Sequence, residues 1–400
     1  MNEHLQKLQP YPFQKLTELL ENAAVETEEP PIALSIGEPQ HSPPEFLLEL
    51  MQNKTTLSGA LGSYPPTKGL PELRRSISNF LSKRYKLNSD LDPESQILPV
   101  NGTREALFAI AQCILSNRSD NLVLMPNPFY QIYEGAAILS GSTPRYINCF
   151  EDNNFQPAFK DISEPEWRKC ELLYICSPGN PSGASINIET MQGLITLSDQ
   201  YEFVIISDEC YSEIYQDENN PPPGLLQASD LLGRKTYKNC LTFNSLSKRS
   251  NLPGLRSGFV AGDEELIEKF LLYRTYHGSA MPLHHQLISA KAWADESHVI
   301  NNRGIYREKF SSVLEILDHS LSVQQPACGF YLWPKTPASD TKFTYDLFRE
   351  TNVKVLPGSF LSRNTPSGNP GENRVRIALV QPLEECIEAA YRIKRFMMQK

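Results

Sequence analysis

Five short motifs bring together residue types that could hold an anion and do chemistry with an amine and a carboxylate. In chain order they are Asn101-Gly102-Thr103, Pro178-Gly-Asn180-Pro-Ser-Gly183, Asp208-Glu-Cys-Tyr211, Ser245-Leu-Ser247-Lys248 and Gly254-Leu-Arg256. Each motif alone is a weak signal, because turns and helix caps use the same residues. The ordered set indicates a ligand site that contains the amine of Lys248 and the carboxylate of Asp208.

An anion site can be read from the residues themselves. Gly102 and Thr103 precede the apolar helical spacing of 103–115, and the free N–H groups of a helix start attract anions. Ser245 and Ser247 offer hydroxyls, and Arg256 offers a forked cation that suits phosphate oxygens. The alternatives are helix capping for the two serines and a surface charge for Arg256.

Alternating strands and helices must position these motifs. Strand-like apolar runs occupy 97–100, 122–125, 172–176, 203–207, 240–243 and 258–261, with helical spacing at 103–115, 130–139 and 188–200. This order predicts an α/β fold with a mostly parallel sheet between helices. Four of the five motifs follow the carboxyl ends of predicted strands, where such sheets bind ligands.

The pattern changes beyond about residue 283. A helix is expected over 298–321, strands over 353–356 and 374–379, and a closing helix over 383–399. We therefore expect an N-terminal arm (1–45) that packs with a small α+β domain (291–400), and a large domain over 46–290.

The composition restricts the partners and the compartment. The 400 residues carry a formal net charge of −9 without a basic block, which disfavours nucleic acid and anionic membranes as partners. We expect a cytoplasmic protein, because no apolar run is long enough to span a membrane and Met1–Lys7 has no apolar signal core. The eight cysteines form no C-x-x-C and the histidines no H-E-x-x-H, so no metal site is expected.

The motifs resemble those of fold-type I, class I/II aminotransferases, from Tyr64 to Arg376. The matching segments are Tyr64-Pro-Pro-Thr-Lys-Gly69, Pro128-Phe-Tyr130, Pro178–Gly183, Ser207–Tyr211, Ser245–Lys248 with Gly254–Arg256, and Arg374-Val-Arg376. The resemblance implies a seven-stranded, mostly parallel sheet and the cofactor pyridoxal 5'-phosphate. A dehydrogenase is disfavoured, since no G-x-G-x-x-G opens a helix after a strand.

The resemblance also assigns roles at the reacting end of the cofactor. Lys248 would carry it as an aldimine and shuttle a proton during ping-pong transamination. Asp208 would keep the ring nitrogen protonated, so that the ring withdraws electrons. Asn180 and Tyr211 match the residues that hydrogen-bond the ring oxygen. For Asn180 a simple turn is the alternative.

Other matched positions surround the ring and the phosphate. Gly102, Thr103 and Arg104 fall in the phosphate turn. Tyr130 matches the residue that stacks on the ring, although Phe129 or Tyr133 could be confused with it. Tyr64 matches a residue that reaches the phosphate of a neighbouring subunit, which implies a homodimer with shared active sites.

The substrate carboxylate has two candidate arginines. Arg376 matches the residue that grips it bidentately. Arg374 lies two positions away and would face the same side of a strand. Gly37 matches a small loop residue whose backbone approaches the same carboxylate.

A closer resemblance is to bacterial N-succinyldiaminopimelate aminotransferases of lysine biosynthesis. It is carried by segments such as Leu8–Phe13, Leu34–Pro39, Leu98–Phe108, His277–Pro282 and Gly329–Trp333. Those enzymes exchange an amino group between glutamate and a succinylated keto acid, with 2-oxoglutarate as the acceptor in the reverse direction. Arg104 and His277 are candidates for the far end of such a substrate.

Three alternatives remain. Aspartate, alanine or aromatic aminotransferases and β-lyases would use nearly the same cofactor residues. A regulator without catalysis could keep the same fold, although no basic DNA-binding module is visible.

Overall fold

The computed structural model describes residues 1–116, 118 and 120–399. In this part of the chain the largest sheet has seven strands in the order β2-β8-β7-β6-β5-β3-β4. They are β2 (Ile97–Val100), β3 (Leu122–Asn127), β4 (Thr143–Asn148), β5 (Cys170–Cys176), β6 (Val204–Asp208), β7 (Cys240–Ser245) and β8 (Gly258–Gly262). All neighbouring pairs are parallel except those of β8, which runs antiparallel to β2 and β7. The predicted mostly parallel seven-stranded sheet is confirmed.

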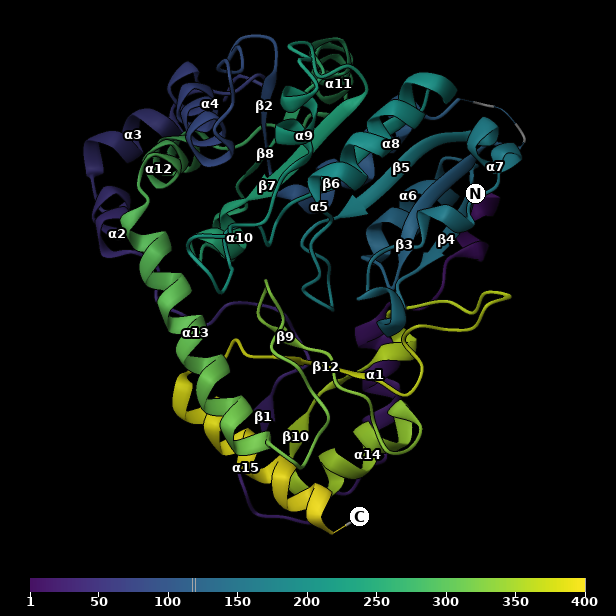
Figure 1. Ribbon diagram of the computed structural model, residues 1–400. Helices are drawn as coiled ribbons and strands as arrows, with labels where there is room; N and C mark the ends of the chain where they lie inside the picture. Colours follow the sequence, from purple (N-terminus) through teal and green to yellow (C-terminus); the bar gives the residue numbers. More distant parts are fainter. Residues whose placement is uncertain (117, 119, 400) are drawn as a thin grey trace.

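Helices cover both faces of this sheet (Figure 1). On β5, Leu173 and Ile175 join one apolar cluster, and Leu172 and Tyr174 join the other, as the two-residue period of a strand requires. The first cluster includes α4 (Pro71–Tyr85), α8 (Ile188–Tyr201), α9 (Leu225–Leu231) and α12 (Leu283–Ala294). The second includes α5 (Thr103–Ile114), α6 (Gln131–Leu139) and α11 (Glu264–His277). Burial on both faces explains why these strands read as continuous apolar runs.

A second, smaller α+β layer lies below the carboxyl edge of the sheet in Figure 1. Its strands are β1 (Ile32–Ala33) paired with β10 (Val353–Lys354), and the antiparallel set β11 (Leu356–Pro357), β12 (Val375–Ala378) and β9 (Tyr331–Leu332). All of them except β11 share one apolar cluster with α13 (Ser297–Leu317), α14 (Asp340–Thr351) and α15 (Leu383–Met398), whereas Leu356 of β11 packs in a smaller cluster with Leu16 and Trp333. This is the α+β unit that the sequence predicts.

The N-terminal segment contacts both layers. Its helix α1 (Pro12–Leu20) contacts α14, and β1 completes a two-stranded sheet with β10. The short 3-10 helix Glu3–Lys7 contacts α6 instead. The remaining helices are α2 (Glu45–Met51), α3 (Lys54–Leu61), α7 (Glu164–Lys169) and α10 (Leu246–Arg249). We retain 1–45, 46–290 and 291–400 as the proposed division into arm and domains.

The long helix α13 runs from the sheet layer down one side of the small layer (Figure 1). Its first residues lie near the end of α10, and its last turns contact α15. In the described residues, no helix is both long and apolar enough to cross a membrane.

Candidate active site

The five motifs meet at one edge of the large sheet. Strands β2, β5, β6 and β7 end there. Because β8 runs the opposite way, it begins there, and its first residue Gly258 pairs with both Val100 and Ser245. Asp208 likewise pairs with Cys176 and, on its other side, with Phe243. The strand ends that the sequence predicts to carry the ligand-binding motifs therefore lie side by side in the structure.

Lys248 lies on the one-turn helix α10, directly after β7. Ser245 caps this helix, because its Oγ accepts a hydrogen bond of 3.1 Å from the Ser247 N–H. The Lys248 amine donates to the Gly37 carbonyl and lies 5.4 Å from the ring centroid of Phe330. Burial lowers the pKa of Lys248 to about 8, and the Arg376 guanidinium acts in the same direction. A neutral amine is therefore accessible near physiological pH, as a nucleophile or a base requires.

Asp208 is the last residue of β6 and is buried. Its Oδ2 accepts a 2.6 Å hydrogen bond from the Tyr133 hydroxyl, and its Oδ1 accepts one of 3.2 Å from the Cys210 N–H. Burial raises the pKa of Asp208, and these two donors together with the charge of Lys248 oppose the rise. Because burial and the hydrogen-bond donors act on its pKa in opposite directions, a cation next to this carboxylate would keep it ionised.

The anion-binding residues lie together at the start of α5. Gly102 has a φ of 77°, and a Cβ there would overlap the Arg256 guanidinium. Arg256 is exposed, and in the described residues it donates to the Pro253 carbonyl at 2.9 Å rather than to a carboxylate. The Ser245 and Ser247 hydroxyls, from the motif that precedes Arg256 in the sequence, lie 2.9 Å apart. An α-helix start, hydroxyls and an uncommitted guanidinium form a suitable donor set for a phosphate.

The two candidate arginines differ in their partners. Arg376, on β12, donates to Asn180 Oδ1 at 3.0 Å and to the Ser35 carbonyl at 2.8 Å. Its Nε is buried and has no hydrogen-bond partner among the described residues. Arg374 lies just before the strand and donates to Glu151 at 2.6 Å. Of the two arginines, only Arg376 lacks a carboxylate partner in the described residues, so the geometry favours Arg376 as the carboxylate-binding residue.

Tyr211 lies between the sheet edge and the small layer. Its hydroxyl is 2.9 Å from that of Tyr331 on β9. Gly37 packs directly against Tyr331, since a Cβ at position 37 would overlap the Tyr331 hydroxyl. The absence of a side chain at Gly37 therefore allows the close packing of Tyr331 against the segment that also touches Lys248.

Of the three aromatic candidates for ring stacking, Tyr130 is the one that remains partly accessible. Phe129 is buried and stacks on Tyr146, while Tyr133 is buried and occupied with Asp208. The Tyr130 hydroxyl accepts a 2.6 Å hydrogen bond from Arg104. This places Arg104 at the same side of the site as the predicted stacking residue.

Comparisons with known proteins agree with this geometry. The sequence model of the family "Aminotransferase class I and II" matches residues 29–393. The chain belongs to this family. A crystal structure of an aminotransferase from Neisseria meningitidis is 46% identical, covers 99% of this chain and 100% of its own, and superposes with a TM-score of 0.94.

Two relatives carry more specific names. An LL-diaminopimelate aminotransferase of Halothermothrix orenii is 29% identical, over 98% of this chain and 97% of its own. A probable N-succinyldiaminopimelate aminotransferase of Thermus thermophilus is 27% identical as a solved structure, with a TM-score of 0.81 over 96% of this chain and 99% of its own.

This aminotransferase is therefore a transaminase that exchanges amino groups between amino acids and keto acids, and its cofactor is pyridoxal 5'-phosphate. The predictions of enzyme class and cofactor are confirmed. The residues present fit the cofactor: the Gly102 backbone faces the Arg256 guanidinium, which has no carboxylate partner among the described residues, and a buried carboxylate and a buried amine lie at the same strand edge.

Two predicted residues of the aminotransferase have no contact with this cluster. Tyr64, in the loop between α3 and α4, has a relative exposure of 101%. His277, the last residue of α11, is exposed and stacks on Tyr273, with ring centroids 5.7 Å apart. Their roles stay predictions.

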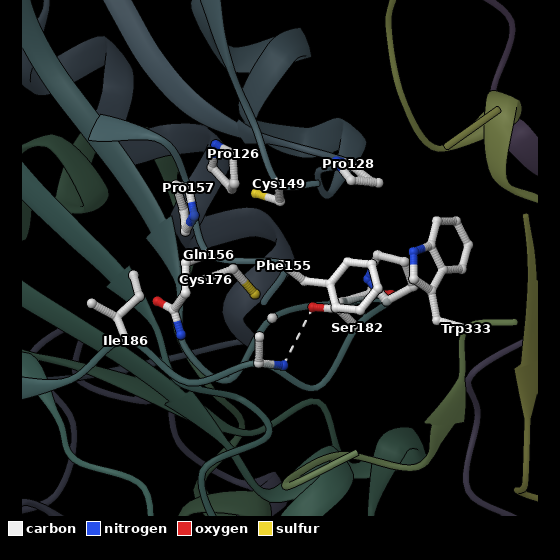
Figure 2. Close-up of a pocket in the computed structure, with 14 residues that line it drawn as sticks. Pro126, Pro128, Cys149, Phe155, Gln156, Pro157, Cys176, Ser182, Ile186 and Trp333 are labelled. Carbon is white, nitrogen blue, oxygen red and sulfur yellow. Dashed lines mark hydrogen bonds between the residues drawn. The ribbon is translucent and has the colours of Figure 1, made fainter. Parts of the chain in front are cut away.

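A small cavity is lined in part by Asn180 and by its loop neighbour Ser182 (Figure 2). Its volume is about 20 Å³, enough for one water but far below the several hundred Å³ of a substrate pocket. Trp333 and Phe155 lie at one end, and the sulfur atoms of Cys149 and Cys176 point in from the other, as Figure 2 shows. The cavity is therefore too small to hold the substrate.

Sequence reasoning named Tyr133 only as a rival of Tyr130 for ring stacking, and it assigned no role to Tyr331 or Ser35. Tyr133 and Tyr331 contact Asp208 and Tyr211, and Ser35 contacts Arg376 through its carbonyl. The signal for Tyr133 was its place one helical turn after Tyr130. Tyr331 lies in the aromatic run Gly329–Trp333, whose neighbours in space no local pattern reveals.

Proposed function

We propose that this transaminase binds its cofactor through Lys248 and acts on an N-succinylated diaminopimelate as amino donor, with 2-oxoglutarate as acceptor. The observation that carries the catalytic part is the convergence of Lys248, Asp208 and Arg376. The charge of Lys248 acts on Asp208, and that of Arg376 acts on the Lys248 amine. Asp208 and Lys248 lie at the carboxyl edge of the large sheet, and Arg376 approaches from β12 of the small layer.

Bound pyridoxal phosphate would supply an aldehyde and an electron-withdrawing ring. Asp208 would lie at the ring nitrogen and hold a proton there. Gly102, Thr103, Ser245, Ser247 and Arg256 would hold the phosphate, with Arg104 at the edge of the same turn. Tyr211 and Asn180 would donate to the ring oxygen, and Tyr130 would stack on the ring.

The Lys248 amine would move the proton that leaves the substrate α-carbon. Its pKa of about 8 suits this task, because a base with a pKa near the operating pH both accepts and returns a proton efficiently. The lowered pKa follows mainly from burial. We therefore expect the amine to act as base and acid in the same turnover.

Arg376 would bind the substrate carboxylate as a fork, with Asn180 and the backbone at Gly37 on either side. Its buried Nε without a partner supports this role, since a carboxylate would satisfy it. Arg104 is the candidate for the far end of the substrate. Its guanidinium is exposed and reaches over Tyr130, so an acidic group there could be paired.

Two donors compete as the natural substrate. The resemblance in sequence segments and the probable N-succinyldiaminopimelate aminotransferase of T. thermophilus favour the succinylated donor. The name of the H. orenii relative favours free LL-diaminopimelate. Both donors present the same α-amino acid group to Arg376 and differ at the far end.

We further propose a homodimer in which Tyr64 reaches the phosphate of the partner. The exposure of Tyr64 together with that of the nearby Leu61 supports this, because apolar side chains exposed close together are typical of an interface. The cytoplasmic location stays a prediction.

The first test is borohydride reduction of the purified protein, followed by peptide mapping. A reduced cofactor on the peptide that contains Lys248 is expected, and a tag elsewhere or none would contradict the proposal. Lys248→Ala is the control and should lose the cofactor absorbance band. Retention of that band would remove Lys248 from its role.

The second test is a substrate panel with 2-oxoglutarate. N-succinyl-LL-diaminopimelate should give the highest kcat/KM. Faster transfer from LL-diaminopimelate, aspartate, alanine or an aromatic amino acid would assign that substrate instead. Pyruvate release from cystathionine would indicate a β-lyase, and no turnover at all would indicate a regulator.

A further inference from the structure

Asn302, on α13, caps the helix that carries Lys248. Its side-chain Nδ2 donates to the carbonyls of Lys248 and Arg249, at 3.2 and 3.3 Å. The last carbonyls of a helix have no partner within the helix, and α10 has only four residues to organise them. With a relative exposure of 2%, Asn302 supplies these hydrogen bonds where water has little access.

The other end of Asn302 binds His41. Asn302 Oδ1 lies 2.9 Å from His41 Nδ1 and also accepts from Asn251 Nδ2 at 2.9 Å. His41 Nε2 lies 2.6 Å from the Lys309 ammonium. An ammonium can only donate, so Nε2 must accept. His41 is therefore neutral, with its proton on Nδ1, and that N–H donates to Asn302.

The surroundings of His41 favour this state. Burial lowers its pKa, and the Lys309 charge lowers it further. The ring stacks on Tyr306 at 4.6 Å, and Lys309 also donates to the carbonyls of Leu379 and Val380 at 3.4 Å. Burial lowers the pKa of Lys309, and Glu384 on α15 opposes this lowering through its charge, without a hydrogen bond.

His41 follows the segment 35–40, which touches the site with its backbone. The Gly37 carbonyl accepts from the Lys248 amine, and the Ser35 carbonyl accepts from Arg376 at 2.8 Å. The same stretch of chain thus contacts the tip of Lys248 directly and the backbone of Lys248 through His41 and Asn302. Both ends of the lysine are held against one segment.

We infer that Asn302 and His41 are positioning residues that align Lys248 with Arg376, through the segment 35–41. The inference rests on the proposed roles of Lys248 and Arg376. The hydrogen bonds of the two residues described above reach neither the Lys248 amine nor the Arg376 guanidinium. They set the distance between the amine that moves the α-proton and the guanidinium that holds the carboxylate, and small errors in such a distance reduce the rate strongly.

The experiment compares four holoenzyme variants with the wild type. Asn302→Ala removes the whole link, and Asn302→Asp keeps the acceptor for His41 but removes both donors to α10. His41→Asn keeps a donor for Asn302 and loses the contact with Lys309. Asn301→Ala is the matched control, because this exposed neighbour on α13 lines the same surface pocket as His41 and Asn302.

The Asn302 variants should keep bound cofactor and lose kcat by about 10- to 100-fold, with a smaller change in KM. The pH midpoint of the holoenzyme absorbance band should also shift, while Asn301→Ala matches the wild type. Unchanged kcat and midpoint in folded Asn302 variants would overturn the inference. If the wild type itself fails to bind the cofactor at Lys248, the proposed function fails instead.

A measurement on the wild type covers the case in which a variant does not fold. Nitrogen-15 NMR of the ring of His41 should show a neutral imidazole with its proton on Nδ1 at pH 7. A proton on Nε2, or a doubly protonated ring at that pH, would overturn the inference, because the link to Asn302 and Lys309 could not then exist.

Discussion

The Tyr133 hydroxyl donates a hydrogen bond of 2.6 Å to Oδ2 of Asp208. Tyr133 is buried under the sheet edge and stacks on Tyr174, with ring centroids 4.6 Å apart. Burial alone would favour the protonated form of Asp208, and this hydroxyl opposes that effect. The ionisation of Asp208, at the end of β6, thus depends on a residue of helix α6.

Replacement of Tyr133 by Phe should raise the pKa of Asp208, because the charged form loses a donor. The loss of about 1–1.5 kcal/mol corresponds to a roughly tenfold lower kcat, and the acidic limb of the pH–rate profile should move to higher pH. Steady-state kinetics from pH 5 to 9 would measure both.

Tyr174→Phe is the control, since the Tyr174 hydroxyl donates to the Leu107 carbonyl and leaves Asp208 untouched. A Tyr133→Phe enzyme with the pH profile of the wild type would contradict the role of this hydrogen bond.

Arg376→Lys should raise KM for the amino acid by about 30- to 100-fold, with little effect on cofactor affinity. A lysine keeps the charge but cannot form the fork, and hydrogen bonds to charged groups contribute about 1.5–3 kcal/mol. Arg374→Lys is the matched variant, because Arg374 is already paired with Glu151. Equal effects of the two substitutions on KM would reverse the assignment.

The capture of pyridoxal phosphate by the cofactor-free protein should accelerate as the pH rises from about 7 to 9. The pKa of Lys248 is about 8 in the folded chain and 10.5 in a free lysine, so the neutral amine appears earlier in the folded chain. The absorbance of the bound cofactor would follow the rate. A midpoint near 10.5 would contradict the lowered pKa.

The same shift has a consequence for stability. Since folding disfavours the charged amine, the cofactor-free protein should gain stability as the pH rises through about 8. Substitution of Arg376 by Leu should raise the pKa of Lys248, because the guanidinium contributes to lowering it.

Gly37→Ala should raise KM and slow turnover, because the new Cβ would overlap the Tyr331 hydroxyl and displace the segment that touches Lys248. Gly193→Ala in α8 is the control. No atom lies within 4 Å of its added Cβ, so helix propensity alone should leave stability equal or higher by up to about 1 kcal/mol. Thermal unfolding and kinetics on both variants would separate displacement from a general effect of alanine.

The strands of the large sheet were the most predictable elements. The run 97–100 agrees with β2 residue for residue, because an apolar strand buried on both faces has sharp polar ends. The expected helix over 298–321 stops at Leu317, since Asp318 leaves the helical region with a ψ of 135°. The expected strand over 353–356 is divided between β10 and β11, which pair with different partners.

The site was predictable where a motif is local. Lys248, Asp208 and Asn180 stand in short recognisable segments next to strand ends. The contacts of Lys248 with Gly37, of Asp208 with Tyr133 and of Tyr211 with Tyr331 join residues far apart in the chain. No periodicity encodes such pairs, because they depend on how the two layers meet.

The reversed direction of β8 has a consequence for the chain between Lys248 and Arg256. The polypeptide leaves β7 and re-enters the sheet at the same edge, so the proposed covalent and ionic attachment points of the cofactor belong to one short excursion. An insertion there would pull the two anchors apart, whereas a change of side chain would not. The length of this excursion should therefore tolerate less variation than its composition.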